Sequence, residues 1–216
     1  MTVDERIDRA GSLYERAVFA GDSDALATAL RDLDSVEADV ALARGRLVHA
    51  RFMEERIEDP HELELFERAA QLYAELGETR GEAESAFWIG TFHQVVRDDN
   101  AAALPYFTRA LELATAAGDR LTSSYALRHL GFTEHMAGRL DAARAYFEES
   151  SRLRTELGFL PGVAANQIGL AHIAAQQDRR DDAAALLKEA TTLAESTGSR
   201  NVLRWIAAAR EELDLP

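Results

Sequence analysis

The chain has no cysteine among its 216 residues. Thiolate metal sites, cysteine nucleophiles and disulfide scaffolds are therefore excluded. It also lacks any run of about 18 apolar residues, the length that a membrane-spanning helix needs. The residues after Met1 (TVDERIDRA) form an acidic amphipathic segment without the apolar stretch of a signal peptide. We therefore expect a cytoplasmic protein.

Basic residues are also in short supply. The chain has 24 Lys and Arg against 38 Asp and Glu, a formal net charge of −14. Such a charge repels phosphate backbones and anionic lipid surfaces, and no local basic patch offsets it. We therefore expect neither nucleic acid nor a membrane as partner. The remaining composition, 47% hydrophobic and 29% charged, is typical of a folded and mostly helical protein.

Motifs of familiar enzymes are absent as well. The sequence has no P-loop, no dinucleotide-binding glycine pattern, no His-Glu-x-x-His and no Gly-x-Ser-x-Gly. Its closest histidine pair, His129 and His135, has a spacing that puts the two rings on different faces of a helix, whereas a metal pair needs i,i+4 spacing. The sequence thus predicts no catalytic residue, no metal site and no cofactor.

A repeated unit is what the sequence does contain, and its clearest copy runs from Tyr125 to Gly158. Apolar residues recur three or four apart on either side of Gly138, which predicts two amphipathic helices joined by a turn. A shift of 40 residues in either direction places the unit on a similar segment. Helix pairs repeated at such a period indicate an α-solenoid.

Three sets of residues mark the period. A glycine follows the second helix of each pair, where a left-handed residue ends a helix. On the second helices a large apolar residue and a small one, three apart on one face, allow neighbouring helices to approach closely. The sets are Gly77, Gly118, Gly158 and Gly198; Phe66, Phe107, Phe147 and Leu187; and Ala69, Ala110, Ser150 and Ala190.

The expected fold is all-α: a right-handed α-solenoid of about five helix pairs plus a C-terminal capping helix, about eleven helices in all and no strand. We expect one solenoid domain over 1–216, with a degenerate first pair in 1–35, regular repeats in 36–198 and the cap in 199–216. The predicted helices are 3–20 with 24–34, 37–57 with 61–76, 80–97 with 100–117, 121–137 with 140–157, 161–177 with 180–197, and 200–213. An extra turn residue between Val96 and Asn100 blurs the phase of the third pair.

The best copy resembles a tetratricopeptide repeat (TPR). Leu130-Gly131 on the first helix, and Ala143, Phe147 and Ser150 on the second, match that family's pattern of Leu-Gly followed by Ala, Phe and Ala at fixed offsets. The resemblance covers about 43–198, and the period of 40 exceeds the usual 34, as in the longer repeats of LuxR-type regulators and kinesin light chains. The chain departs from the pattern because no proline closes each repeat.

The resemblance implies that the first helices line a concave groove that binds the ligand. Carried over residue by residue, it predicts a groove that is neutral to mildly basic and aromatic, with Arg128 as the main anion anchor. Arg152 and Arg154, on a second helix, are expected to face outward. The predicted groove residues are Arg44, Arg51, Trp88, Phe92, Tyr125, Arg128, His129, Phe132, His135, Asn166, His172 and Gln176, with Arg204 and Trp205 of the capping helix reaching across the end.

The segment from Gly162 to Gln177 is unusual because it has no charged residue. Either the helix is covered on all sides, or its open face lines a pocket through Asn166, Gln167, His172 and Gln176. The sequence leaves both readings open.

Two functions follow from these patterns. The first is a protein- or peptide-binding scaffold or adaptor, with a possible regulatory role, whose groove takes a partner that carries a carboxylate. The alternative is a small-molecule-binding protein or unusual enzyme, with a pocket between the fourth and fifth pairs that uses His129, His135 or His172. The absence of enzyme motifs favours the first, and the oligomeric state is not predicted.

Overall fold

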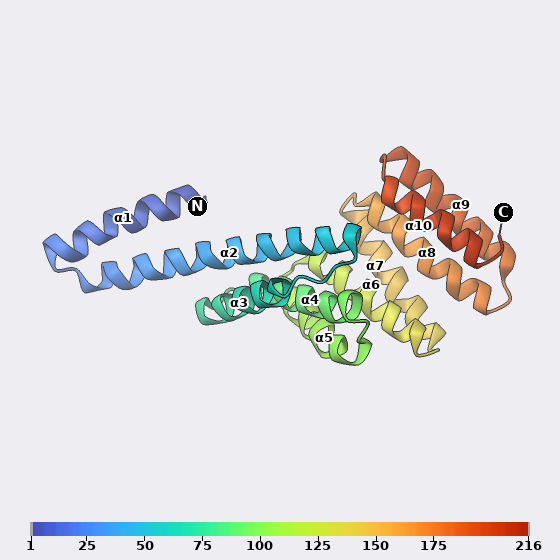
Figure 1. The fold of residues 1–216 in the computed structure, drawn as a ribbon, viewed down its shortest axis with the longest axis horizontal. Coiled ribbons are helices and arrows are strands. Elements are labelled where there is room, and N and C mark those ends of the chain that lie inside the picture. Colours follow the sequence, from blue (N-terminus) through green and yellow to red (C-terminus); the bar gives the residue numbers. More distant parts are fainter. Residues whose placement is uncertain (1, 216) are drawn as a thin grey trace. The chain divides into compact units, whose positions relative to one another are not determined.

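A computed structural model describes residues 2–215, and this part of the chain is all-α (Figure 1). It contains ten α-helices and one π-helical segment, and no strand occurs among the described residues. The prediction of an all-α repeat solenoid is confirmed. The helices form two compact units, Met1–Ala117 and Gly118–Pro216, which are described separately below.

Unit 1 consists of three successive helix pairings. The N-terminal part of α2 packs on α1, its C-terminal part packs on α3, and α4 packs on both α3 and α5. The elements are α1 (Val3–Ala20), α2 (Ser23–Glu55), α3 (His61–Leu76), α4 (Thr79–Thr91), the π-helical η1 (Phe92–Val96) and α5 (Asn100–Ala116).

Unit 2 contains two complete helix pairs and a final helix. The pairs are α6 (Arg120–Met136) with α7 (Leu140–Glu156), and α8 (Leu160–Gln176) with α9 (Arg180–Ser196). The last helix, α10 (Arg200–Glu212), contacts α8 and α9. Its Val202, Ile206 and Ala209 are buried against the core of the last pair. It therefore caps the unit as predicted.

Helix α2 corrects the predicted boundaries, because 24–34 and 37–57 are one continuous helix of 33 residues. The intervening residues Ser35 and Val36 include no glycine or proline, so nothing in the backbone forces the helix to end there. The same helix consequently serves as the second helix of the first pair and the first helix of the second pair.

The predicted packing sets are confirmed. The four large residues are 0–3% exposed and the four small ones are fully buried. The phenylalanines pack on glycines of first helices: a Cβ at Gly90 would lie 2.8 Å from Phe107, and one at Gly169 would lie 2.6 Å from Phe147. At the helix ends Gly77, Gly118, Gly158 and Gly198 all have φ between 64° and 73°, the left-handed conformation that a helix-ending glycine favours.

The phase of the third pair shifts as predicted, but the extra residue lies in η1 and not between Val96 and Asn100. A π-helical turn accommodates one more residue than an α-helical turn, and Phe92–Val96 forms such a turn at the end of α4. Arg97 N donates to Phe92 O at 3.2 Å, a bond between residues five apart. The insertion accounts for the extra residue between Gly77 and Gly118 relative to the other repeats.

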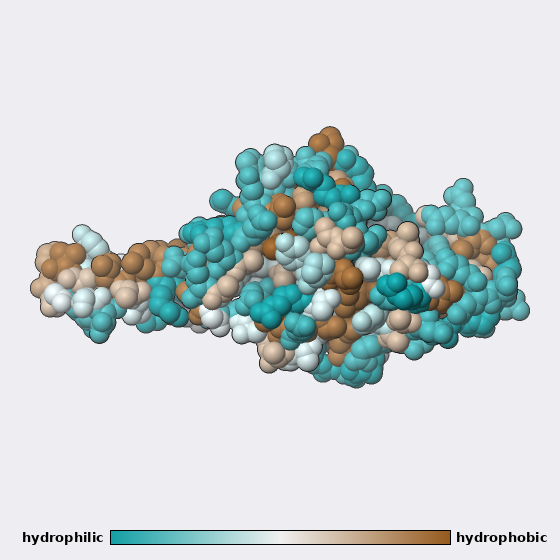
Figure 2. All heavy atoms as spheres, turned by 90° about the horizontal axis from the view of Figure 1, so that it is seen from below, coloured by the Kyte–Doolittle hydropathy of each residue, from teal (hydrophilic) through white to brown (hydrophobic). Residues whose placement is uncertain are grey.

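The α1–α2 hairpin covers only part of its apolar surface. Ala10, Leu13 and Ala17 pack against Ala25 and Ala29. The hairpin gives each helix here a single packing partner, so only a narrow stripe is covered. Several apolar side chains of α1 and α2 are therefore exposed, and Figure 2 shows apolar side chains at the left end of the molecule, where this hairpin lies. The exposed residues are Ile7, Tyr14, Val18, Phe19, Leu26, Leu30 and Leu33.

Candidate partner-binding face

The first helices of unit 2 lie side by side, since α8 contacts both α6 and α10. The 40-residue period places Tyr125 in register with Trp205, and Phe132 in register with His172 and Glu212. Phe132 is 41% exposed and Trp205 is 43% exposed. We call the side formed by Tyr125, Arg128, Phe132, His172, Trp205 and Glu212 the first-helix face.

Arg128 connects this face to the interior of the unit. Its Nη1 donates to Ala165 O at 2.7 Å and to Asn166 Oδ1 at 3.1 Å, so the side chain of α6 is tied to α8. The guanidinium carbon lies 6.0 Å from the centre of the Phe147 ring. Burial lowers the pKa of Arg128 to about 10, and at neutral pH the group still carries its charge.

Arg154 overturns the expectation that it faces outward. It is 1% exposed and is the largest fully buried side chain. Its Nη1 donates to Gly162 O at 2.8 Å and to Asn166 Oδ1 at 3.0 Å, and its guanidinium carbon lies 5.0 Å from the Tyr125 ring centre and 5.4 Å from that of Phe159. Arg128 therefore does not stand alone, because a second guanidinium shares its acceptor, the Asn166 amide oxygen.

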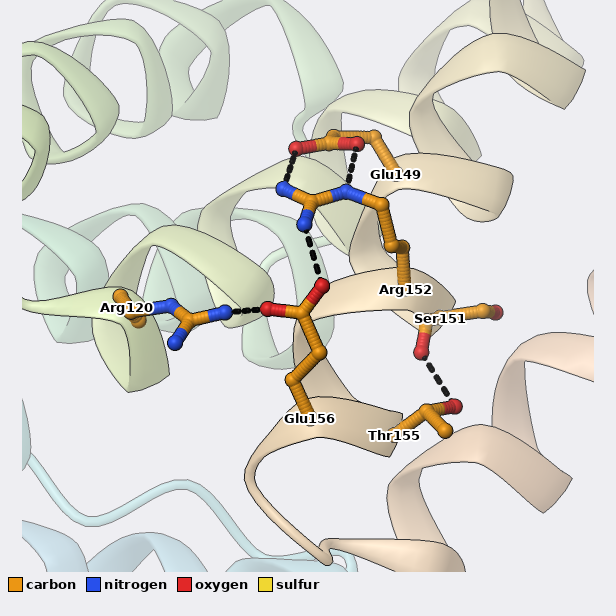
Figure 3. A network of polar contacts seen from close by, with 6 residues as sticks. All are labelled: Arg120, Glu149, Ser151, Arg152, Thr155 and Glu156. Carbon is orange, nitrogen blue, oxygen red and sulfur yellow. Dashed lines mark hydrogen bonds and ion pairs between the residues drawn. The ribbon is translucent and has the colours of Figure 1, made fainter.

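Arg152, two residues earlier on the same helix, is exposed as predicted. Figure 3 shows its guanidinium donating hydrogen bonds to Glu149 and to one carboxylate oxygen of Glu156. Arg120 contacts the other oxygen of Glu156. The same view shows the Thr155 hydroxyl donating to Ser151 O at 2.8 Å. The charge of Arg152 is thus balanced by two carboxylates at the surface.

Asn166 is fully buried, so it cannot contact a partner directly as the sequence prediction had it. Its amide oxygen accepts from both arginines, and its amide nitrogen donates to Ser150 Oγ at 2.9 Å and to Ser151 Oγ at 3.1 Å. A buried amide needs such partners. Asn166 therefore lies beneath the first-helix face and fixes the positions of the two guanidinium groups through its amide oxygen.

Two of the predicted histidines come together. The rings of His135 and His172 lie 6.3 Å apart, and His172 Nε2 lies 3.8 Å from Glu212 Oε2. Burial lowers the pKa of both; His172 lowers that of His135 further, whereas a hydrogen bond with Gln176 opposes the shift. His135 Nε2 is buried without a hydrogen-bond partner among the described residues. Both rings are therefore held mainly neutral.

The other predicted residues of unit 2 are less central. His129 is half-buried on α6. Gln176 and Arg204 are exposed, and Arg204 donates to Asn201 of its own helix. Their side chains lie at or near the surface.

The predicted groove residues of unit 1 are divided between surface and core. Arg44 and Arg51 are exposed, and Arg51 pairs with Asp59. Phe92 is 2% exposed, so its assignment to a ligand-binding surface is wrong; η1 turns the ring inward. Trp88 is half-buried and stacks on Phe66 with ring centres 5.6 Å apart. Of these four predicted residues, Arg44 and Arg51 are exposed, Trp88 is half-buried and Phe92 is buried.

The absence of charge in α8 is explained by burial. Nine of its residues are buried between the neighbouring helices, including Asn166 and Gln167. Burial accounts for the absence of charge at these nine positions, whereas His172 is half-buried and Gln176 is exposed. A cleft of about 400 Å³ does occur in unit 2, but it lies beside the second helices and contains no histidine in its lining. Its lining residues are Arg144, Glu148, Leu170, Arg179, Asp182, Ala185, Leu186 and Glu189.

Within residues 2–215, no group of three or more His, Asp or Glu side chains is placed to hold a metal ion. No helix there combines the length and the apolar character needed to cross a bilayer.

The family model of the tetratricopeptide repeat matches residues 82–156 and 122–196, which together span more than half of the chain. The chain belongs to the tetratricopeptide repeat family. Repeats of this family generally mediate protein–protein interactions. A search of curated proteins finds no match to this TPR protein.

The sequence analysis did not predict two buried polar features: the side chain of Arg154 in unit 2, and the pair of Glu62 and His49 in unit 1. The TPR period itself held a signal for Arg154, because Ala114 and Ala194 occupy the same position in the neighbouring repeats and both are fully buried. In unit 1, Glu62 is fully buried on α3, and its Oε1 accepts a hydrogen bond from His49 Nδ1 at 2.7 Å. Glu62 belongs to the first turn of α3, where a helix dipole favours a carboxylate.

Proposed function

We propose that this TPR protein is a scaffold or adaptor that binds a protein or peptide through the first-helix face of unit 2. The observation that carries the proposal is the exposure of Phe132 and Trp205, at 41% and 43%, on first helices. The large residues of the second helices in this unit, Phe147 and Leu187, are by contrast buried. Exposed aromatic side chains on a repeat scaffold are the usual anchors of a partner.

The surroundings of the anchors favour an extended or helical peptide. The residues that define this face carry one cation, Arg128, and one carboxylate, Glu212, which lies 3.8 Å from His172. Arginine recognises carboxylates with directional hydrogen bonds. A cytoplasmic adaptor with a regulatory role, like the repeat arrays of LuxR-type regulators, is the form of this function that we propose.

Selection from a random peptide library on the full chain tests the proposal. We expect peptides with apolar anchors to be enriched, and Phe132→Ala and Trp205→Ala to weaken their binding about tenfold or more, as removal of a central anchor does. Arg152→Ala, on the second-helix side, is the matched control and should bind normally. Peptides whose affinity depends on Arg152 and not on Phe132 or Trp205 would place the functional surface on the other side.

A small-molecule site is the second candidate, favoured by one observation. His135 Nε2 is buried without a partner beside His172, and such an unsatisfied group is unusual unless something binds it. Native mass spectrometry of the purified protein tests this candidate. An organic molecule retained by the wild type and lost from His135→Gln would support it, whereas a spectrum of bare protein would count against it.

A further inference from the structure

Two positive charges, the buried Arg154 and the half-buried Arg128, lie in unit 2 without a negative counterpart. Arg128 and Arg154 bond to two backbone carbonyls and to the amide oxygen of Asn166, all of which are neutral acceptors. Among the described residues, no carboxylate pairs with either guanidinium. This is notable in a chain with 38 acidic residues against 24 basic ones.

Both groups are charged at neutral pH. Burial lowers the pKa of Arg128 to about 10 and that of Arg154 to about 9, and the charge of Arg128 contributes to the second shift. Both values remain above 7, so the site holds two like charges. Buried charge without a counter-charge is destabilising, and neutral acceptors offset it only in part.

Arg128 and Arg154 also have guanidinium N–H groups that form no short hydrogen bond within the described part of the chain. A guanidinium has five N–H groups, and each arginine uses only its Nη1 for the short bonds at 2.7–3.1 Å. A longer contact of 3.4 Å joins Arg154 Nε to Ser124 Oγ. Arg154 Nη2 is buried with no hydrogen-bond partner in the described part of the chain.

Simple packing does not require an arginine here. The equivalent positions of the neighbouring repeats are Ala114 and Ala194, and those of Asn166 are Ala126 and Ile206, all of them buried. Arg152 shows how the same helix balances a surface arginine, with two glutamates (Figure 3). Two polar residues have therefore replaced apolar ones at interior positions of the repeat, without a carboxylate to balance them.

We propose that Arg128 and Arg154 form a binding site for one small oxyanion, a carboxylate or a phosphate, which reaches them from the first-helix face beside Tyr125. Both kinds of group offer the two adjacent oxygens that a guanidinium binds side by side. Arg128 supplies donors at the half-buried mouth, Arg154 supplies the second charge behind it, and Asn166 holds both in place. The site deepens the proposed function and rests on it for the biological source of the anion, which would be an anionic group of the partner.

Free anions test the site without any partner. The thermal midpoint of the full chain is measured in a chloride buffer of constant ionic strength while inorganic phosphate, or separately acetate, replaces chloride. We expect a saturable rise, about 2–4 °C at an anion concentration of about five times Kd. The anion whose titration saturates at the lower concentration, phosphate or acetate, is the preferred oxyanion.

Matched variants assign the effect to the site. Arg152→Gln should keep the saturable rise, because its charge is balanced elsewhere, and Arg128→Gln should lose it. Asn166→Asp places a carboxylate within reach of both guanidinium groups, so it should raise the midpoint in chloride alone and blunt the response to added anion. An equal, non-saturating rise in wild type, Arg128→Gln and Arg152→Gln would overturn the proposal.

The side-chain ¹⁵N–¹H resonances of the arginines give a readout that needs no variant to fold. In the wild type, the Nε–H signals of Arg128 and Arg154 should shift with added anion while that of Arg152 stays fixed; three unmoved signals would reject the site. The outcome is also separable from the proposed function. If peptide binding depends on Phe132 but no anion response is seen, the oxyanion site is wrong and the proposed function stands. If an anion response is seen but no peptide binds, the oxyanion site stands and the proposed function is wrong.

Discussion

At the residue scale, the structure shows side chains whose environments differ sharply over short distances. Arg152 and Arg154 are two positions apart on α7. Arg152 is exposed and forms ion pairs with Glu149 and Glu156, whereas Arg154 is 1% exposed. A helix turns by about 100° per residue, so a spacing of two puts side chains on well-separated faces. The helical phase, rather than the residue type, decides the role of each arginine.

Phe147 is a core residue of unit 2 whose truncation should lower stability strongly. It is 3% exposed, lies against Gly131 and Gly169 of two first helices, and packs on Ala143 and Ile173. We expect Phe147→Ala to lower the free energy of unfolding by about 3–5 kcal/mol, the usual effect of removing a core aromatic ring. Chemical denaturation measures it. Phe132→Ala, an exposed ring on α6, is the control and should stay within about 0.5 kcal/mol.

The histidine pair predicts a loss of stability in mild acid. The pKa values of His135 and His172 are both lowered in the folded protein, so between those values and 6.5 the unfolded chain binds more protons than the folded chain. Stability is then fully present above about pH 6.5 and falls as the pH drops through the folded-state values. Unfolding midpoints measured from pH 7.5 to 5 should fall less in the double variant His135→Gln/His172→Gln. Parallel curves for the two proteins would contradict the assignment.

At the element scale, the continuity of α2 is the main departure from the predicted boundaries. One helix of 33 residues links the α1 pairing to the α3 pairing. It is held near its middle by side chains from other elements: Arg6 contacts Ser35 and Asp39, and Tyr73 donates to Asp39 at 2.8 Å. A helix that is packed and bonded on both sides of a junction has no reason to break there.

A proline at position 35 tests this continuity. In a helix interior proline removes a backbone hydrogen bond and clashes with the preceding turn, so Ser35→Pro should cost about 3 kcal/mol or more. Ser35→Ala removes the same contact with Arg6 and keeps the helix, and it should cost far less. Circular dichroism with denaturation compares the two. Equal stability of the variants would show that the chain bends at this point after all.

At the scale of the whole molecule, a repeat array must cover the apolar face of its last pair. In unit 2 α10 does this, through Val202, Ile206 and Ala209 packed against Ala183, Leu187 and their neighbours. Repeat proteins depend on such terminal caps because every interior pair relies on its neighbours. The exposed apolar residues of α1 and α2 show that the opposite end of the chain is covered less completely.

Loss of the cap should change the association state. A chain that ends at Gly198 exposes the apolar face of α9 around Leu187, and surfaces of that kind associate. We expect this truncated protein to oligomerise or precipitate, as seen by light scattering. Val202→Ala in the full chain, which keeps the cap in place, is the milder control and should stay dispersed. A monomeric truncated protein with native helicity would argue against the capping role.

The sequence alone determined the repeat, because periodic glycines and phenylalanines have a local cause: a left-handed helix end and a large side chain packed on a small one recur wherever the pair recurs. The partner contacts that it predicted for Phe132 and Arg128 stay predictions. Only the tertiary structure decided the environment of Arg154, Asn166 and Phe92, because burial depends on the helices that cover a residue and on shifts of phase such as the π-helical turn at Phe92–Val96. The uncompensated charge of Arg128 and Arg154 belongs to this second kind, since it arises from side chains of α6 and α7 that share one acceptor on α8.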